Sequence, residues 1–193
     1  MTNALWYFGR GFGVSALALF SIVVVLGIVT RAGRPLPGLP RVAVTTAHRT
    51  VSLSAVAFLA LHVVTLLFDP YAQLRATDVV LPFLSTYRPF WQGLGTLALD
   101  LAIVLVVSSL LRNRLGLRTW QAIHWLAYGC WPLAVVHAVG TGTDRGSTWL
   151  LGVVGGCVLV VTGAVGWRLL GSRFVPPEPP NRIPPPRDLA GLR

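Results

Sequence analysis

Apolar residues in this chain gather into five long runs, and shorter segments that hold most of the charges separate them. Each run has about 20 mostly apolar residues, the length that an α-helix needs to cross the hydrocarbon core of a bilayer. The first run is too long for a secretory signal and lacks a small-residue cleavage site, so it is predicted to stay a helix. The pattern predicts membrane-spanning helices over residues 5–29, 47–68, 92–111, 119–139 and 148–170.

Composition supports a membrane protein. Hydrophobic residues make up 54% of the 193 residues and charged residues only 11%, a balance that soluble domains rarely have. We therefore expect an all-α membrane protein, a bundle of about five transmembrane helices over residues 1–171. Residues 172–193 hold seven prolines, which exclude a continuous helix, and are predicted to form a Pro-rich cytoplasmic tail.

The net charge of +10 comes from arginine alone, because the chain has no lysine. Twelve of the 16 arginines fall on one side of the predicted spans, so the positive-inside rule places the N-terminus outside and the C-terminus in the cytoplasm. The arginines lie between apolar runs, which favours contact with membrane lipid and argues against nucleic acid as a partner. All-arginine usage is typical of a GC-rich bacterial genome. Together with the five predicted spans, it indicates a multi-pass protein of the inner (plasma) membrane.

The chain has four histidines, and all of them lie in the second and fourth spans, which run in the same direction. His48 and His62 are separated by about 21 Å of helical rise, and His124 and His137 by about 20 Å. The pairs match in depth, so His48 with His124, and His62 with His137, could each ligate the iron of one b-type haem. This pattern predicts two haems between the second and fourth helices, with the four histidines as metal ligands.

The angular positions of the histidines around each helix axis fit this hypothesis well for one pair and poorly for the other. His48 and His62 differ by about 40° on an ideal helix, whereas His124 and His137 differ by about 140°. Pro132 lies between the second pair and could kink or re-phase that helix. The alternative interpretation is that each histidine is an ordinary polar residue with hydrogen bonds inside a bundle.

Other residues are candidates for the same site. Arg10 could pair with a propionate of the outer haem or reach the outer headgroups, and Arg49 has the same two options at the inner face. Asp100, in the middle of the third span, could be a proton-coupled site or could hydrogen-bond a neighbouring helix. Three glycines would let a helix or a porphyrin approach the first span closely: Gly9, Gly11 and Gly13.

Two segments, HRTVSLSAVAFLALHVVTLLFD and RTWQAIHWLAYGCWPLAVVHAV, resemble the haem-binding helices of the ferric reductase-like transmembrane domain family. That family includes the membrane parts of ferric reductases and NADPH oxidases and the haem subunit of the methionine sulfoxide reductase system. The resemblance covers roughly residues 4 to 170. It implies that His48 and His124 bind the inner haem, and His62 and His137 the outer one.

Two departures from the family limit what is carried over. Many members have six spans and a cytoplasmic flavin and nicotinamide domain, whereas this sequence has five spans and no GxGxxG motif. We therefore expect an electron-transfer subunit without catalytic residues of its own. Its donor would be a separate redox partner protein, a flavin carrier or a quinol.

The resemblance implies outward electron flow to an extracytoplasmic acceptor, which we expect to dock at residues 69–90. Two alternatives stay open: a quinone-linked cytochrome b subunit, and a haem-free membrane scaffold or assembly protein.

Overall fold

The computed structural model describes residues 4–31, 40–142 and 146–172. The predicted Pro-rich tail lies outside these residues, so its boundary stays a prediction. The described chain is helical, and five of its helical segments are long and apolar enough to cross a membrane, which confirms the predicted all-α class and number of spans. The elements are α1 (Ala4–Arg31), α2 (Arg41–Leu67), α3 (Ala76–Val80), α4 (Pro89–Leu110), α5 (Arg112–Leu115), α6 (Leu117–His124), α7 (Ala127–Thr141) and α8 (Thr148–Ser172).

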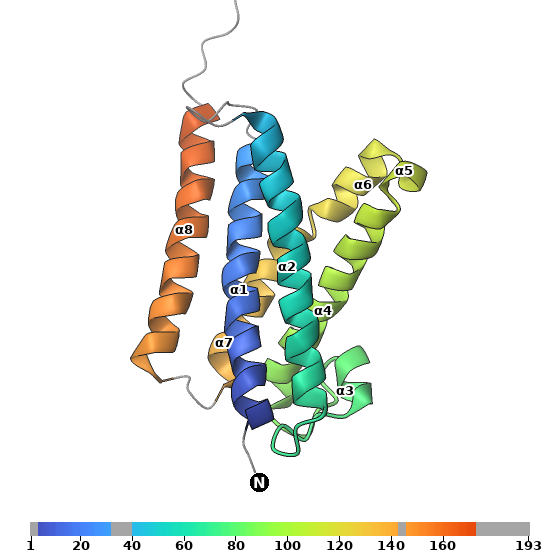
Figure 1. The fold of residues 1–193 in the computed structure, drawn as a ribbon, viewed down its shortest axis with the longest axis vertical. Coiled ribbons are helices and arrows are strands. Elements are labelled where there is room, and N and C mark those ends of the chain that lie inside the picture. Colours follow the sequence, from blue (N-terminus) through green and yellow to red (C-terminus); the bar gives the residue numbers. More distant parts are fainter. Residues whose placement is uncertain (1–3, 32–39, 143–145, 173–193) are drawn as a thin grey trace, which may run out of the picture.

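Helix α1 occupies the centre of the bundle (Figure 1). It packs along α2 on one side and α8 on another, and it also contacts α7. Helix α4 packs against α6 and α7. Among the described helices, α2 has no contact with α4, α6 or α7 comparable to the one it makes along α1. The fold is therefore a pair, α1 and α2, set beside a second group formed by α4, α6 and α7.

Small and branched residues form the core, as is usual where helices pack within a membrane. One buried cluster joins α1 to α8 through Leu17, Leu150 and Val154. Another joins α4 to α7 around Cys130, which is 1% exposed and whose thiol donates to the carbonyl oxygen of Ala98 at 3.2 Å. Phe20 of α1 packs against the second cluster and Ala134 of α7 against the first, so the clusters also join α1 to α7. Helix α2 packs along α1 alone among the larger contacts of the described helices.

The fourth span is broken, whereas the sequence predicted one helix over residues 119–139. Helix α6 ends at His124 and α7 begins at Ala127. Between them the backbone tightens into 3₁₀ geometry. An α-helical amide donates to the carbonyl oxygen four residues earlier, whereas the amides of Leu126, Tyr128 and Gly129 donate to the one three residues earlier. Pro132 follows one turn later and has no N–H to offer the carbonyl of Tyr128.

This tight turn reduces the angular mismatch between His124 and His137. A 3₁₀ segment advances about 120° per residue, against about 100° in an α-helix, so each residue adds about 20°. From His124 to Gly129 the surplus is at most about 100°, which offsets part of the 140° difference expected of a regular helix. The turn therefore brings the two histidines closer to a common face.

A polar link in the middle of the bundle joins α1 to α7. The indole N–H of Trp131 donates to Oγ of Ser21 at 2.9 Å, and this hydroxyl donates to the carbonyl oxygen of Leu17 at 2.8 Å. Ser21 is 3% exposed, so no water can replace it. The link fixes α7 against α1 at the level where the fourth span changes from 3₁₀ to α geometry.

We expect Ser21→Ala to lower the free energy of unfolding by about 1 kcal/mol, because it leaves the Trp131 N–H without its acceptor. Equilibrium unfolding in mixed detergent micelles measures this. Thr162→Ala on α8 is the matched control, since the hydroxyl of Thr162 is exposed and bonds only within its own helix. Equal losses in the two variants would contradict an interhelical role for Ser21.

Candidate haem-ligand site

His48 on α2 and His124 at the end of α6 face each other across the space between the two helix groups. Their ring centroids are 6.4 Å apart and the ring planes make an angle of 67°. The side chains come from helices whose backbones do not pack closely. The structure thus brings together the inner pair that the sequence predicted.

His62 on α2 and His137 on α7 are the residues predicted to form the outer pair, and each ring contacts a backbone carbonyl of a neighbouring helix. Nδ1 of His62 lies 2.7 Å from the carbonyl oxygen of Gly9 on α1. Nδ1 of His137 lies 2.9 Å from the carbonyl oxygen of Trp91 on α4. A carbonyl only accepts hydrogen bonds, so Nδ1 carries the proton in each ring and Nε2 is left with a free lone pair, the form in which imidazole binds a metal.

Glycines on the packing helices make room for three of the rings. A Cβ added at Gly13 would lie 2.7 Å from Nδ1 of His62, and one at Gly95 would collide with the His137 ring. A Cβ at Gly27 would lie 3.5 Å from Cε1 of His48. At Gly13 and Gly95 the carbonyl that accepts the Nδ1 proton belongs to the residue four positions earlier, one helical turn away. The glycine and the carbonyl together hold the ring flat against the neighbouring helix.

Sequence reasoning found only part of this arrangement. Gly9 and Gly13 do allow a close approach, but of α2 side chains, and Gly11 faces open space. The roles of Gly27 and Gly95 were missed. A usable signal was present on α1: fourteen residues separate Gly13 from Gly27, and fourteen separate His48 from His62 on the antiparallel neighbour, so each glycine meets one histidine.

The inner histidines are held differently from the outer ones. Nδ1 of His48 and Nδ1 of His124 are buried and have no hydrogen-bond partner. The Val23 carbonyl lies beside the His48 ring, outside hydrogen-bonding geometry. The His124 ring stacks on Trp120 with centroids 4.9 Å apart. Buried ring nitrogens without partners are unusual in a packed bundle, so hydrogen bonds through Nδ1 do not explain the placement of these two rings.

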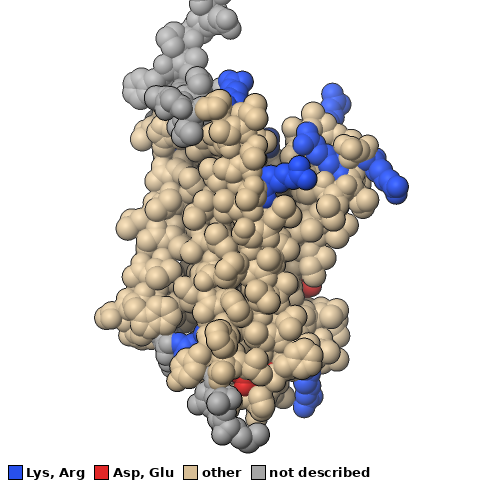
Figure 2. Space-filling view, in the orientation of Figure 1, with Lys and Arg blue, Asp and Glu red and all other residues tan. Residues whose placement is uncertain are grey.

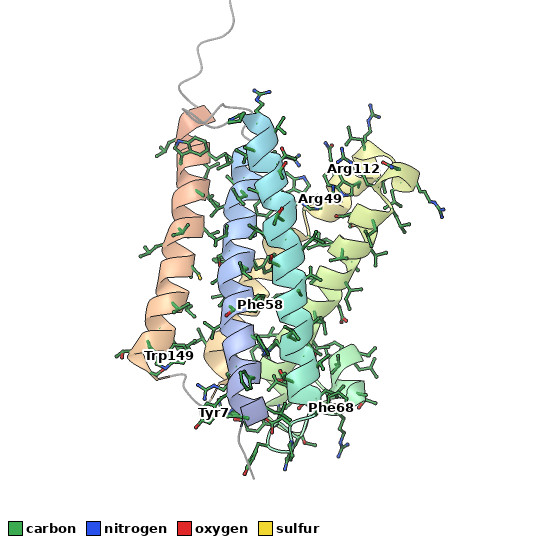
Figure 3. The ribbon with its side chains drawn as sticks, viewed as in Figure 1. Tyr7, Arg49, Phe58, Phe68, Arg112 and Trp149 are labelled. Carbon is green, nitrogen blue, oxygen red and sulfur yellow. The ribbon has the colours of Figure 1, made fainter. Side chains whose placement is uncertain are left out.

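Arginines gather at the end of the molecule that carries α5 and the start of α2 (Figure 2). Figure 3 places Arg49 and Arg112 at this end, on opposite helix groups. The Arg112 guanidinium lies 4.6 Å from the centre of the Trp120 ring, and that of Arg31 lies 4.8 Å from the centre of Trp125. Arg31, which sequence reasoning treated only as an orientation signal, thus lies over the residue that follows His124. The inner pair therefore lies under positive charge.

At the other end, Arg10 follows Gly9, whose carbonyl oxygen is the hydrogen-bond partner of His62. The Arg10 side chain is half-buried, and its guanidinium lies 5.9 Å from the centre of the Trp6 ring. Arg10 is thus at the level of the outer pair, as predicted. Its pairing with a propionate stays a prediction, as does that of Arg49, which is exposed beside His48.

The segment after α2, predicted as a loop, is ordered by its own polar contacts and contains α3. Asp78 is buried, accepts the Arg75 N–H at 3.1 Å, and its carbonyl oxygen accepts the Thr96 hydroxyl at 2.7 Å. Arg88 donates from Nη1 to the carbonyl oxygen of Gly140 at 2.8 Å, near the end of α7. These bonds tie the segment to α4 and α7 at the end of the bundle that holds the outer histidines.

Asp100 is half-buried on α4 and makes no hydrogen bond to another described residue. The interhelical bond that the sequence favoured for it is not found among the described residues. A proton-coupled role for this carboxyl group stays a prediction.

The site defines a class of protein: a multi-pass helical membrane protein that presents four histidines, at two depths, from helices that do not pack closely on each other. The residues fit haem, since two Nε2 atoms are left free by their Nδ1 bonds, two further rings lack partners, and glycines make space for three rings. The chain belongs to the ferric reductase like transmembrane component family, whose model matches residues 12–135, more than half of its length. This family typically binds haems and implies electron transfer within the membrane.

The matched segment includes His48, His62 and His124 and ends two residues before His137. His137 lies outside the matched residues, so its assignment as a ligand stays a prediction. Neither the comparison with curated proteins nor the comparison with solved structures finds a match.

Proposed function

We propose that this protein carries electrons across the membrane through two b-type haems, the inner one held by His48 and His124 and the outer one by His62 and His137. The observation that carries the proposal is the approach of His48 and His124 across the space between α2 and α6, with 6.4 Å between their ring centroids. Two imidazoles that bind one metal ion from opposite sides hold their nitrogens about 4 Å apart. A centroid distance of 6.4 Å leaves room for that arrangement.

The chain's own residues would do three things at this site. The backbone carbonyls of Gly9 and Trp91 fix the tautomer and direction of the outer ligands. Arg10 and Arg49 would neutralise propionates at the two ends. The apolar helices around the histidines exclude water. This lowers the reorganisation energy of electron transfer between the haems. When bound, each haem supplies a one-electron carrier whose potential is set by these ligands and their surroundings.

Charge supports one orientation. The end of the molecule with the inner pair carries exposed Arg31, Arg49, Arg112, Arg114 and Arg118, so it would face the cytoplasm. The donor would be a separate redox protein, a flavin carrier or a quinol that approaches this end. The acceptor would dock outside, at the ordered segment that contains α3. Electron flow would then run from the inner pair to the outer pair.

A haem-free scaffold is less consistent with the geometry. Histidines that serve only to join helices should bond through their ring nitrogens, because a buried unsatisfied group costs about 1–3 kcal/mol. Nδ1 of both inner histidines is buried without such a bond. Hydrogen bonding through Nδ1 therefore does not account for the inner pair, which makes a purely structural role less consistent with the geometry.

The proposal is tested by haem content. We expect the purified protein, expressed with ample haem, to contain about two b-type haems per chain, because it presents two histidine pairs. A pyridine haemochrome assay and a dithionite-reduced minus oxidised spectrum measure this. A folded preparation with no haem would refute the proposal and leave the scaffold role in its place.

A further inference from the structure

The end of the molecule that holds the inner histidines carries charge of a single sign. Exposed arginines come from four helices there, α1, α2, α5 and α6: Arg31, Arg49, Arg112, Arg114 and Arg118. The acidic residues within the described ranges lie elsewhere, after the outer end of α2 or in the middle of α4: Asp69, Asp78 and Asp100. Figure 2 shows basic side chains on both helix groups at this end.

We propose that this arginine-rich surface is the docking site of a soluble electron-carrier protein with an acidic surface, and that Arg112 and Trp120 lie at its centre. The inference rests on the proposed function, because a carrier that docks here is a donor only if the inner pair binds haem. It goes further by naming the chemistry of the donor, which the ligand assignment leaves open.

Aromatic and apolar side chains lie among these arginines. The Arg112 guanidinium is 4.6 Å from the centre of the Trp120 ring, and that of Arg31 is 4.8 Å from the centre of Trp125. Trp125 is 50% exposed and Leu117 is 55% exposed. Arginine and tryptophan are enriched where proteins bind one another, and a guanidinium already held by a ring loses less freedom on docking. Arginines that only orient a protein in the membrane need no such contacts.

Trp120 connects this surface to the inner pair. Its ring stacks on that of His124 with centroids 4.9 Å apart, and the His124 ring faces that of His48. A carrier seated on Arg112 is therefore separated from the His124 ring by one aromatic side chain. The carrier would lose one electron and the inner site would gain it, with no bond made or broken.

Charge complementarity indicates the partner's chemistry. A surface of one positive sign repels basic proteins and steers acidic ones towards it. Anionic lipid headgroups carry the same charge as an acidic protein, but they surround the rim of a membrane protein. Arg49 directly follows His48, and Arg31 lies over the residue that follows His124, so these charges are set beside the inner pair itself. This placement favours a protein partner over lipid.

Binding of a charged probe to the haem-loaded protein in phosphatidylcholine nanodiscs tests the inference. The probe is cytochrome c with succinylated lysines, which is acidic, and unmodified cytochrome c is its basic counterpart with the same fold. We expect only the acidic form to bind, with an affinity that falls as salt is added. Arg112→Gln should weaken binding by about 5-fold, because it removes a charge at the centre of the surface.

Arg168→Gln is the matched control. Arg168 is half-buried near the end of α8, which lies on the other side of α1 from α5 and α6 (Figure 1). The substitution removes the same charge from the same end of the molecule, so it should leave probe binding unchanged. Equal losses in Arg168→Gln and Arg112→Gln would show that net charge, not this surface, attracts the probe, and would overturn the inference.

Two other results would also overturn it. One is equal binding of both forms of cytochrome c. The other is no probe binding, with phosphatidylglycerol retained by the unmodified protein and lost from Arg112→Gln in native mass spectrometry, which would assign the surface to lipid headgroups. Haem content is measured separately, so a protein that binds the acidic probe but contains no haem would refute the proposed function instead.

Discussion

Replacement of an outer histidine by alanine, His62→Ala or His137→Ala, should reduce the haem content from about two to about one per chain. Each substitution removes one of two axial ligands, and the partner ring alone cannot hold the iron in the same low-spin state. The remaining inner haem should keep its spectrum, because its ligands lie about 20 Å away along the same helices. A pyridine haemochrome assay with a low-temperature difference spectrum measures both effects.

Ser52→Ala is a suitable control for this experiment. Ser52 lies one turn after His48 on α2, and its hydroxyl donates to the His48 carbonyl oxygen at 2.6 Å, so the substitution perturbs the same helix without touching a ring nitrogen. It should keep both haems. If His62→Ala and His137→Ala also keep two haems, the outer ligand assignment is wrong.

Of two glycines on α1, two residues apart, only one should be sensitive to replacement by alanine. A Cβ at Gly13 would lie 2.7 Å from Nδ1 of His62, whereas nothing lies within 4 Å of one at Gly11. Gly13→Ala should push the ring off the Gly9 carbonyl and weaken binding of the outer haem by about 10- to 100-fold, the usual cost of losing a group that orients a metal ligand. Gly11→Ala should bind as the unmodified protein does.

Haem retention during dilution into haem-scavenging apomyoglobin compares these two variants. The pair is well matched, because both substitutions add one methyl group to the same turn of the same helix. Equal retention in Gly13→Ala and Gly11→Ala would show that the close contact between α1 and His62 does not hold the ligand.

Much of the fold could be predicted, because hydrophobic length is a strong signal. The five spans and the depth of the four histidines follow from run length and helical rise alone. The predicted approach of His124 to His48 agrees with the structure. The haem itself and the role of each ligand stay predictions.

What could not be predicted depends on contacts between distant segments. The break after His124 requires a local change to 3₁₀ geometry, and a periodicity measured on a regular helix cannot detect it. The bond from Arg88 to Gly140 joins residues 52 positions apart. The approach of Arg31 to Trp125 depends on how α1 packs beside the start of α7. A sequence pattern predicts which residues share a face of a helix, but not which neighbouring helix that face packs against.

The central claim is that electrons cross the bilayer through the two histidine pairs, and a vesicle assay tests it most directly. Haem-loaded protein is reconstituted into liposomes that enclose dithionite, and membrane-impermeant ferricyanide is added outside. The account predicts ferricyanide reduction that depends on the protein and is lost in His62→Ala, since one of the two haems is then missing. Ferricyanide reduction at the same rate in His62→Ala, or none above protein-free vesicles with the unmodified protein, would contradict the account.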